Sequence, residues 1–174
     1  MKVGIIGCGN IGTELALFIG KDTDFELNYL CDINTGHAHE LQKKIGNGQK
    51  ATSIGDLITN SELIIEAASK DAVKDILNIE NIDKKGKKLI IMSTGGLIEN
   101  LDSFRKIKNC EVYLPSGAIA GLDAIKAVSG KISSLTLTTT KSIEGLRDAP
   151  FIIKNNINLN KLKTKKTIFE GNLK

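Results

Sequence analysis

Val3-Gly4-Ile5-Ile6-Gly7-Cys8-Gly9-Asn10-Ile11-Gly12 is a short apolar run that leads directly into glycines at the spacing GxGxxG. Apolar residues then recur at helical spacing, at Leu15, Ala16 and Ile19. The stretch therefore predicts a strand, a tight turn and a helix in immediate succession. In that context, this glycine spacing indicates a dinucleotide-binding site.

Each glycine of this turn has a separate physical task. Gly7 permits the tight turn after the strand, and Gly9 leaves the space through which a pyrophosphate approaches the main chain. Gly12 allows the helix to pack closely on the strand. We expect the pyrophosphate on the unpaired amides at the positive end of the helix, where an anion is favoured.

A second predicted strand, residues 27–32, ends in an acidic side chain. Asp32 lies 20 residues after Gly12, where a carboxylate is expected to receive the ribose hydroxyls of a dinucleotide. The alternative interpretation is a glycine-rich turn followed by an unrelated aspartate.

The length and composition of the chain limit its class. A chain of 174 residues corresponds to one domain, or to one domain with part of another. No apolar stretch approaches the roughly 20 residues of a membrane span, and no cleavable signal pattern precedes the first strand. The three cysteines are far apart and lack a CxxC spacing, which predicts reduced thiols in a cytoplasmic protein. A redox sensor at Cys8 is the alternative to a small filler residue there.

The net charge of +4 is concentrated in the C-terminal part. From Phe151 onward the sequence contains six lysines and one glutamate. Nucleic-acid binding requires basic residues interleaved with aromatics or set along a reading helix, and this segment has neither arrangement. We therefore expect no nucleic-acid partner.

Strand-like and helix-like segments alternate from the N-terminus to about residue 114. The expected helices cover residues 37–45, 53–59, 70–77 and 101–107, and further strands cover residues 62–68, 88–92 and 110–114. This alternation predicts an α/β fold, a Rossmann-type doubly wound parallel sheet with right-handed crossovers.

The pattern changes in the C-terminal part. Residues 133–140 alternate apolar and polar side chains with period two, which predicts a strand with one solvated face, and residues 167–169 are a second candidate. Two strands do not form a stable sheet alone. We predict a dinucleotide-binding domain over residues 1–115, then a linker helix and the incomplete beginning of a mixed α+β substrate or dimerisation domain over residues 116–174.

Small residues follow several of the expected strands, at Ala67-Ala68-Ser69, Ser93-Thr94-Gly95-Gly96 and Pro115-Ser116-Gly117-Ala118. Doubly wound sheets bind ligands off the carboxyl ends of their strands, so we expect these segments to meet beside the glycine turn. The alternative for each segment is an ordinary strand-to-helix turn, and for the last one a linker helix between domains.

The sequence resembles the L-aspartate dehydrogenases of NAD biosynthesis. The resemblance rests on Gly-Cys-Gly-Asn-Ile-Gly, Glu66-Ala67-Ala68-Ser69, Ser93-Thr94-Gly95-Gly96-Leu97 and Pro115-Ser116-Gly117-Ala118-Ile119-Ala120-Gly121-Leu122-Asp123-Ala124. Further similarity occurs at Thr138-Thr139-Thr140-Lys141 and Phe169-Glu170-Gly171, so nearly the whole chain is covered.

The resemblance implies oxidation of L-aspartate to iminoaspartate, which feeds quinolinate synthesis, and assembly as a homodimer or association through the C-terminal sheet. It implies NAD as the cofactor, with NADP as the alternative, and the absence of an arginine beside Asp32 favours NAD. The pyrophosphate residues that it implies are Gly7, Gly9, Asn10, Ile11 and Gly12, with Asp32 on the adenosine ribose. The residues that it implies beside the nicotinamide are Ala67, Ala68, Ser69 and Ala118.

The sequence departs from the family in its histidines. The family histidine taken as the acid–base group belongs to a segment beyond Phe169-Glu170-Gly171, and this sequence ends three residues after Gly171. His37 and His39, the two histidines present, lie in the helix after the second strand. Their HxH spacing points the rings to different faces, so we interpret both as surface residues and expect no metal site. We therefore expect a C-terminally truncated homologue, without a catalytic residue of its own and inactive alone.

Two other functions fit the same pattern. One is a non-catalytic, NAD-binding or regulatory module with the dehydrogenase fold. The other is a different amino-acid-pathway dehydrogenase of similar build, such as a homoserine dehydrogenase or a dihydrodipicolinate reductase, against which the Pro-Ser-Gly-Ala stretch argues.

Overall fold

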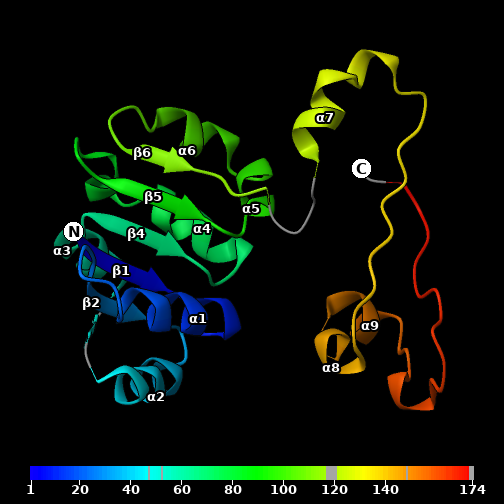
Figure 1. Ribbon diagram of the computed structural model, residues 1–174, viewed down its shortest axis with the longest axis horizontal. Coiled ribbons are helices and arrows are strands. Elements are labelled where there is room, and N and C mark those ends of the chain that lie inside the picture. The colour runs from blue at the N-terminus through cyan, green and yellow to red at the C-terminus, as the bar shows by residue number, and fades with distance from the viewer. Residues whose placement is uncertain (47, 52, 117–120, 148, 173–174) are drawn as a thin grey trace. The chain divides into compact units, whose positions relative to one another are not determined.

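The computed structural model describes residues 1–46, 48–51, 53–116, 121–147 and 149–172. The chain divides into two compact units, Met1–Leu122 and Asp123–Lys174, which are drawn in Figure 1 and described here one at a time. The functional domain boundary predicted after residue 115 stays a prediction.

A parallel sheet of six strands forms the centre of the first unit (Figure 1). Its strands are β1 (Lys2–Ile6), β2 (Glu26–Cys31), β3 (Gln49–Lys50), β4 (Leu63–Glu66), β5 (Lys88–Ile91) and β6 (Glu111–Tyr113). They lie in the order β3-β2-β1-β4-β5-β6, and every pair is parallel. This order reverses direction between β1 and β4, so the predicted Rossmann-type doubly wound sheet is confirmed.

Helices cover both faces of this sheet. They are α1 (Asn10–Ile19), α2 (Thr35–Ile45), α3 (Ile54–Asn60), α4 (Lys70–Leu77), the short 3₁₀ helix η1 (Glu80–Asp83), α5 (Gly95–Ile98) and α6 (Leu101–Lys106). One hydrophobic core joins α1 and α2 to the sheet, and a second core joins α3, α4, η1 and α5 to it. Both cores consist mainly of Ile, Leu and Val, as the scarcity of aromatic residues requires.

In the central strand β4, successive side chains pack into the two different cores. All four of its residues are buried. Ile64 packs into the core of α3 and α4, whereas Leu63 and Ile65 pack into the core of α1 and α2. A strand that is buried on both faces must be apolar along its length, and the run Leu63–Glu66 ends in the one charged exception.

Local signals set the helix ends. The side chains of Ser53 and Ser69 accept amide hydrogen bonds at the N-termini of α3 and α4. Gly46 ends α2 with φ of +78°, a left-handed conformation that favours glycine. The strands and helices expected for this unit are confirmed, and β3, only two residues long, is an addition that no periodicity announced.

The second unit contains short helices. They are α7 (Leu122–Ala127, which begins at the unit boundary), the 3₁₀ helices η2 (Ser129–Lys131) and η3 (Leu159–Lys161), α8 (Ile143–Leu146) and α9 (Pro150–Lys154). The helix expected near Gly121 is confirmed as α7. Among all the described helices of the chain, none has the length and apolar character to cross a membrane.

The two strands expected in the second unit are not formed, and that prediction is wrong. Residues 133–140 and 167–169 carry no strand assignment, so this part of the chain forms no beginning of a sheet. Alternation with period two gives a strand only where a neighbouring strand accepts and donates the ladder hydrogen bonds. No such neighbour exists among the described residues of this unit, and Leu135 and Leu137 remain exposed.

A single carboxylate fastens the turn before β6 to η1. Oδ1 of Asp83, the last residue of η1, accepts hydrogen bonds from the main-chain amides of Lys108, Asn109 and Cys110 at 2.8, 2.6 and 3.1 Å. These bonds, that of the Asn109 amide first, hold the pKa of Asp83 below its usual value. The turn before β6 is thus fastened to η1 by the charged form of one side chain.

This fastening predicts a pH-dependent contribution to stability. A carboxyl group whose pKa is lowered by folding stabilises the protein above its unfolded pKa, about 3.9, and loses that effect as the pH falls through the folded value. Asp83→Ala should therefore lower the melting temperature at pH 7, and the difference from wild type should shrink below about pH 4. Asp102→Ala is the control, because Asp102 is an exposed aspartate that pairs with Arg105 at the surface, where an ion pair contributes little to stability. A wild-type advantage that is unchanged in acid would contradict this role for Asp83.

Candidate functional site

The glycine turn after β1 is held against two neighbouring strands. Gly7 has φ of +98°, and its amide donates a hydrogen bond to the Cys31 carbonyl oxygen at 2.8 Å. A Cβ at Gly7 would lie 2.6 Å from main-chain atoms of Ala67 and Ala68. Glycine is therefore required here both by conformation and by the direct approach of the loop after β4.

Gly12 and Gly9 lie in opposite surroundings. A Cβ at Gly12 would lie 1.9 Å from the carbonyl oxygen of Gly7, because the first turn of α1 folds tightly over the glycine turn. A Cβ at Gly9 would lie within 4 Å of no other described segment of the chain, and the φ of −75° at Gly9 is open to any residue. Packing within the protein thus explains the glycine at Gly12, and leaves Gly9 free for an approaching group.

The N-terminus of α1 fits an anion. Gly9 is the N-cap and supplies no side-chain hydrogen bond, and the first turn contains no acidic residue. The amides of Asn10, Ile11 and Gly12 have no carbonyl partner within the helix, since the first such bond runs from Thr13 to the Gly9 oxygen. Unpaired amides beside open space are what a pyrophosphate would occupy.

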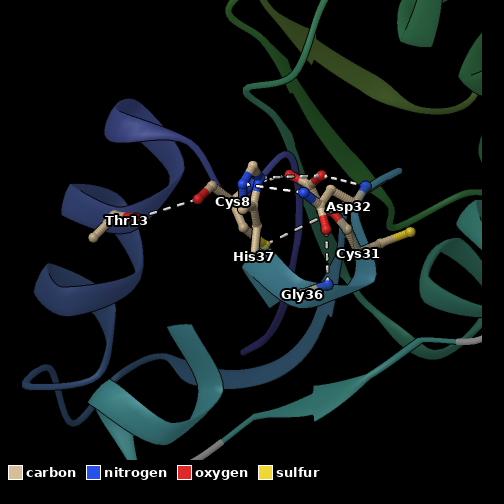
Figure 2. Close-up of polar contacts among 7 residues, drawn as sticks. Cys8, Thr13, Cys31, Asp32, Gly36 and His37 are labelled. Atoms are coloured by element: carbon tan, nitrogen blue, oxygen red, sulfur yellow. Dashed lines mark hydrogen bonds and ion pairs between the residues drawn. The ribbon is translucent and has the colours of Figure 1, made fainter. Parts of the chain in front are cut away.

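Asp32 binds the glycine turn directly (Figure 2). Its Oδ2 accepts a hydrogen bond from the Cys8 amide at 2.7 Å, and its Oδ1 accepts one from the Asn34 amide at 2.8 Å. The side chain is only 11% exposed. The carboxylate at the end of β2 therefore fixes the position of the turn after β1, a role that spacing alone did not reveal.

Asp32 retains capacity for a ribose. Each carboxylate oxygen has two acceptor positions, and each accepts one hydrogen bond from the main chain. The ring of His37 lies beside it, with Nδ1 3.8 Å from Oδ1 (Figure 2). Ile33, the next residue along the chain, is fully exposed. The surroundings of Asp32 thus combine an acceptor with apolar and aromatic surface, which suits a nucleoside.

The thiol of Cys8 is poorly suited to redox chemistry. Its side chain is buried, and Sγ lies 3.9 Å from the Cys31 carbonyl oxygen. Burial first, then the charges of Asp32 and Cys31, raise the pKa of Cys8 to about 12. Because the thiolate is the reactive form, Cys8 is best explained as a small buried residue.

Glu66 is the most unusual side chain at this end of the sheet, because it is fully buried at the end of β4. Its Oε1 accepts hydrogen bonds from the Ala68 amide at 2.8 Å and the Ser93 hydroxyl at 2.9 Å, and its Oε2 accepts one from the Ser93 amide at 2.9 Å. One carboxylate therefore ties together the loops that follow β4 and β5. From sequence, Glu66 is predicted only as part of a motif, and the signal that could have singled it out is an acid in an otherwise apolar strand.

The predicted site residues fall into three groups. Gly7, Gly9, Asn10, Ile11, Gly12 and Asp32 come together around the glycine turn, and Ala67, Ala68 and Ser69 form the adjoining loop after β4. Ser69 also caps α4. Ala118 lies outside the described residues. His37 and His39 are exposed on α2, and no group of His, Cys, Asp or Glu suited to a metal occurs in the part of the chain that the structure describes.

Comparison with solved structures agrees with the fold. An imine reductase from Myxococcus stipitatus, in complex with NADP⁺, is similar with a TM-score of 0.52 and 16% identity over 66% of this chain and 40% of the reductase. An apo scyllo-inositol dehydrogenase from Lactobacillus casei gives the same TM-score and identity over 66% of this chain and 36% of its own. At these identities the similarity concerns the fold alone.

Sequence comparison is more specific. Residues 7–112 match the family described as "Homoserine dehydrogenase, NAD binding domain", and residues 123–174 match "Aspartate dehydrogenase, C-terminal". Curated L-aspartate dehydrogenases are similar over nearly the whole chain: that of Methanosarcina mazei is 37% identical over 98% of this chain and 65% of its own length, and that of Nitrosopumilus maritimus is 32% identical over 99% and 66%. The chain thus spans about two-thirds of the length of these relatives. It belongs to the L-aspartate dehydrogenase family, with an NAD-binding domain of the homoserine dehydrogenase type over residues 7–112.

Proposed function

We propose that this chain binds NAD across the glycine turn and serves the oxidation of L-aspartate to iminoaspartate. The observation that carries the proposal is the open N-terminus of α1 beside Asp32, with Gly9 facing unoccupied space. The curated relatives named L-aspartate dehydrogenase support the choice of reaction. NAD supplies the hydride acceptor when it is bound.

Different residues contact different parts of the cofactor. In this proposal the amides of Asn10, Ile11 and Gly12 hold the pyrophosphate, and Asp32 accepts the hydroxyls of the adenosine ribose. The loops after β4 and β5 then lie along the nicotinamide half. The residues that we propose contact the nicotinamide half are Ala67, Ala68, Ser69 and Ala118.

The chemistry needs a group that handles a proton. Oxidation of the amine transfers a hydride from the substrate Cα to the nicotinamide, and a proton leaves the nitrogen. A histidine near its ordinary pKa is the usual base for such a step. His37 and His39 are both on α2, and His37 lies beside Asp32 on the proposed adenosine side.

The position of these histidines also favours a second function. A non-catalytic NAD-binding module needs the glycine turn and Asp32 but no base beside the nicotinamide. We propose that the polypeptide of this sequence, taken alone, acts in this way. The enzymatic and non-catalytic functions differ only in turnover, so a single assay separates them.

We also propose a cytoplasmic location and self-association through the second unit. Three free cysteines support a reducing compartment. Exposed apolar side chains in residues 123–174 support association, among them Leu135, Ile153 and Phe169.

Alanine substitutions at two glycines separate cofactor binding from folding. A Cβ at Gly12 would overlap the Gly7 carbonyl oxygen, so Gly12→Ala should lower the free energy of unfolding by about 1–3 kcal/mol or more. Gly9→Ala should keep the melting temperature but raise the Kd for NAD about tenfold or more, since its methyl group would occupy the approach of the pyrophosphate. Thermal unfolding and calorimetric titration measure the two effects. If Gly9→Ala bound NAD as tightly as wild type does, the pyrophosphate would not bind beside Gly9.

Asp32 should determine the choice between the two nicotinamide cofactors. A carboxylate repels the 2′-phosphate of NADP, so wild type should bind NAD more tightly. Asp32→Asn keeps an acceptor oxygen and removes the charge, and should narrow the NAD-to-NADP affinity ratio about tenfold. Asp22→Asn is the matched control, because Asp22 accepts an amide hydrogen bond from Asp24 in the loop before β2. Tighter binding of NADP than of NAD by wild type would reject this role for Asp32.

The assay for turnover is NADH production from L-aspartate by the purified chain. We expect NAD binding without detectable turnover, because losing a general base alone costs a factor of about 10²–10⁴. The Methanosarcina mazei relative, assayed in parallel, controls for conditions. Robust turnover by this chain would mean that another of its side chains acts as the base.

A further inference from the structure

We propose that Glu66 is a positioning residue for the nicotinamide half of NAD, acting through the two loops that its carboxylate joins. The inference rests on the proposed function, because it assumes that NAD lies across the carboxyl ends of β1, β4 and β5. It assigns Glu66 no contact with the cofactor and no proton transfer.

The first support is that neither core packing nor an ion pair explains an acid at Glu66. The other three residues of β4 are apolar and pack into the two cores. Among the described residues, no lysine or arginine forms an ion pair with Glu66. A buried polar group is costly unless it is hydrogen-bonded, and three hydrogen bonds compensate the burial of this side chain.

The second support is the identity of those donors. Two are main-chain amides, of Ala68 and Ser93, and the third is the Ser93 hydroxyl. A carboxylate accepts at both oxygens and donates at neither, so it can satisfy all three at once. Glu66 therefore fixes main chain in both loops, rather than the rotamer of one neighbour.

The third support is where these loops lie. β1 and β4 are adjacent at the point where the strand order reverses, which is where doubly wound sheets bind ligands. The Ala67 amide donates to the Ile6 carbonyl oxygen at 2.8 Å, and Gly7 approaches Ala67 too closely for a side chain. The loop after β4, one of the two loops that Glu66 joins, thus adjoins the glycine turn.

Asp32 and Glu66 hold different parts of this edge of the sheet. Asp32 ties the end of β2 to the glycine turn, whereas Glu66 ties the loop after β4 to the loop after β5. With NAD bound as proposed, the first connection serves the adenosine half and the second serves the nicotinamide half. Loss of the second should therefore affect a ligand only if that ligand has a nicotinamide.

The substitution Glu66→Gln tests whether Glu66 affects only the nicotinamide half of the ligand, because glutamine has nearly the same shape as glutamate. The amide group of glutamine must face one of the three donors, and the Ser93 hydroxyl alone can turn to accept from it. In either orientation at least one of the two main-chain amides, of Ala68 or Ser93, loses its hydrogen bond, and the two loops relax. Ser93→Ala is the second variant, because it removes one hydrogen bond without placing a donor in the site.

The matched control is Glu62→Gln. Glu62 adjoins the opposite end of β4, is exposed, and accepts a hydrogen bond from the Lys2 amide at 2.7 Å. It therefore repeats the same kind of contact, a carboxylate on a main-chain amide, away from the proposed site. The Glu62→Gln variant should bind NAD and ADP-ribose as tightly as wild type does.

The experiment measures Kd for NAD and for ADP-ribose, which lacks the nicotinamide, on the four proteins. We expect Glu66→Gln to raise Kd for NAD about tenfold and to change Kd for ADP-ribose less than about twofold. Ser93→Ala should show the same selectivity with a smaller effect, and it carries the test if Glu66→Gln does not fold. Equal losses for both ligands, no loss for either, or a wild type that gains no affinity from the nicotinamide would overturn the role of Glu66. Wild type binding neither ligand would instead reject the proposed function.

Discussion

Hydrogen bonds from main-chain amides to two carboxylates organise the ligand-binding edge of this protein. Parallel strands end at the same edge of the sheet, and the loops that follow them contain amides with no place in the ladder. Asp32 accepts such a bond from the glycine turn, and Glu66 accepts two from the loops after β4 and β5. Each carboxylate thereby joins two strand ends, Asp32 those of β2 and β1 and Glu66 those of β4 and β5, and both side chains are largely buried.

Beside these bonded loops lies the N-terminus of α1. The amides at the N-terminus of α1 lack partners within the helix, and the space beside Gly9 is open. A ligand that binds there meets main chain already held by its neighbours, so little conformational entropy is lost on binding. The amides at the N-terminus of α1 that lack helix partners, set beside loops whose amides are already hydrogen-bonded, thus explain why a glycine motif at this edge suits a pyrophosphate.

The sheet domain was predictable from sequence because its signals are local. Apolar runs of four or five residues announced β1 and β4, and the GxGxxG spacing placed the turn that α1 follows. The hydrogen bonds that Asp32 accepts from Cys8 and Glu66 accepts from Ser93 were not predictable, because they join residues 24 and 27 positions apart through the tertiary fold. The strand expected over residues 133–140 failed for a related reason. Alternation describes which side chains could face a core, but a partner strand is needed to make the ladder.

An amide NMR titration with NAD tests most directly whether the cofactor lies across this edge of the sheet. We predict that the largest shifts occur at the amides of residues 8–12, with further shifts in residues 67–69 and at Ser93, while the amino-terminal ends of the strands stay unchanged. Titration with ADP-ribose should reproduce the first group of shifts and leave the second small. Shifts confined to residues outside the glycine turn, or no saturable shifts at all, would contradict NAD binding at the end of β1.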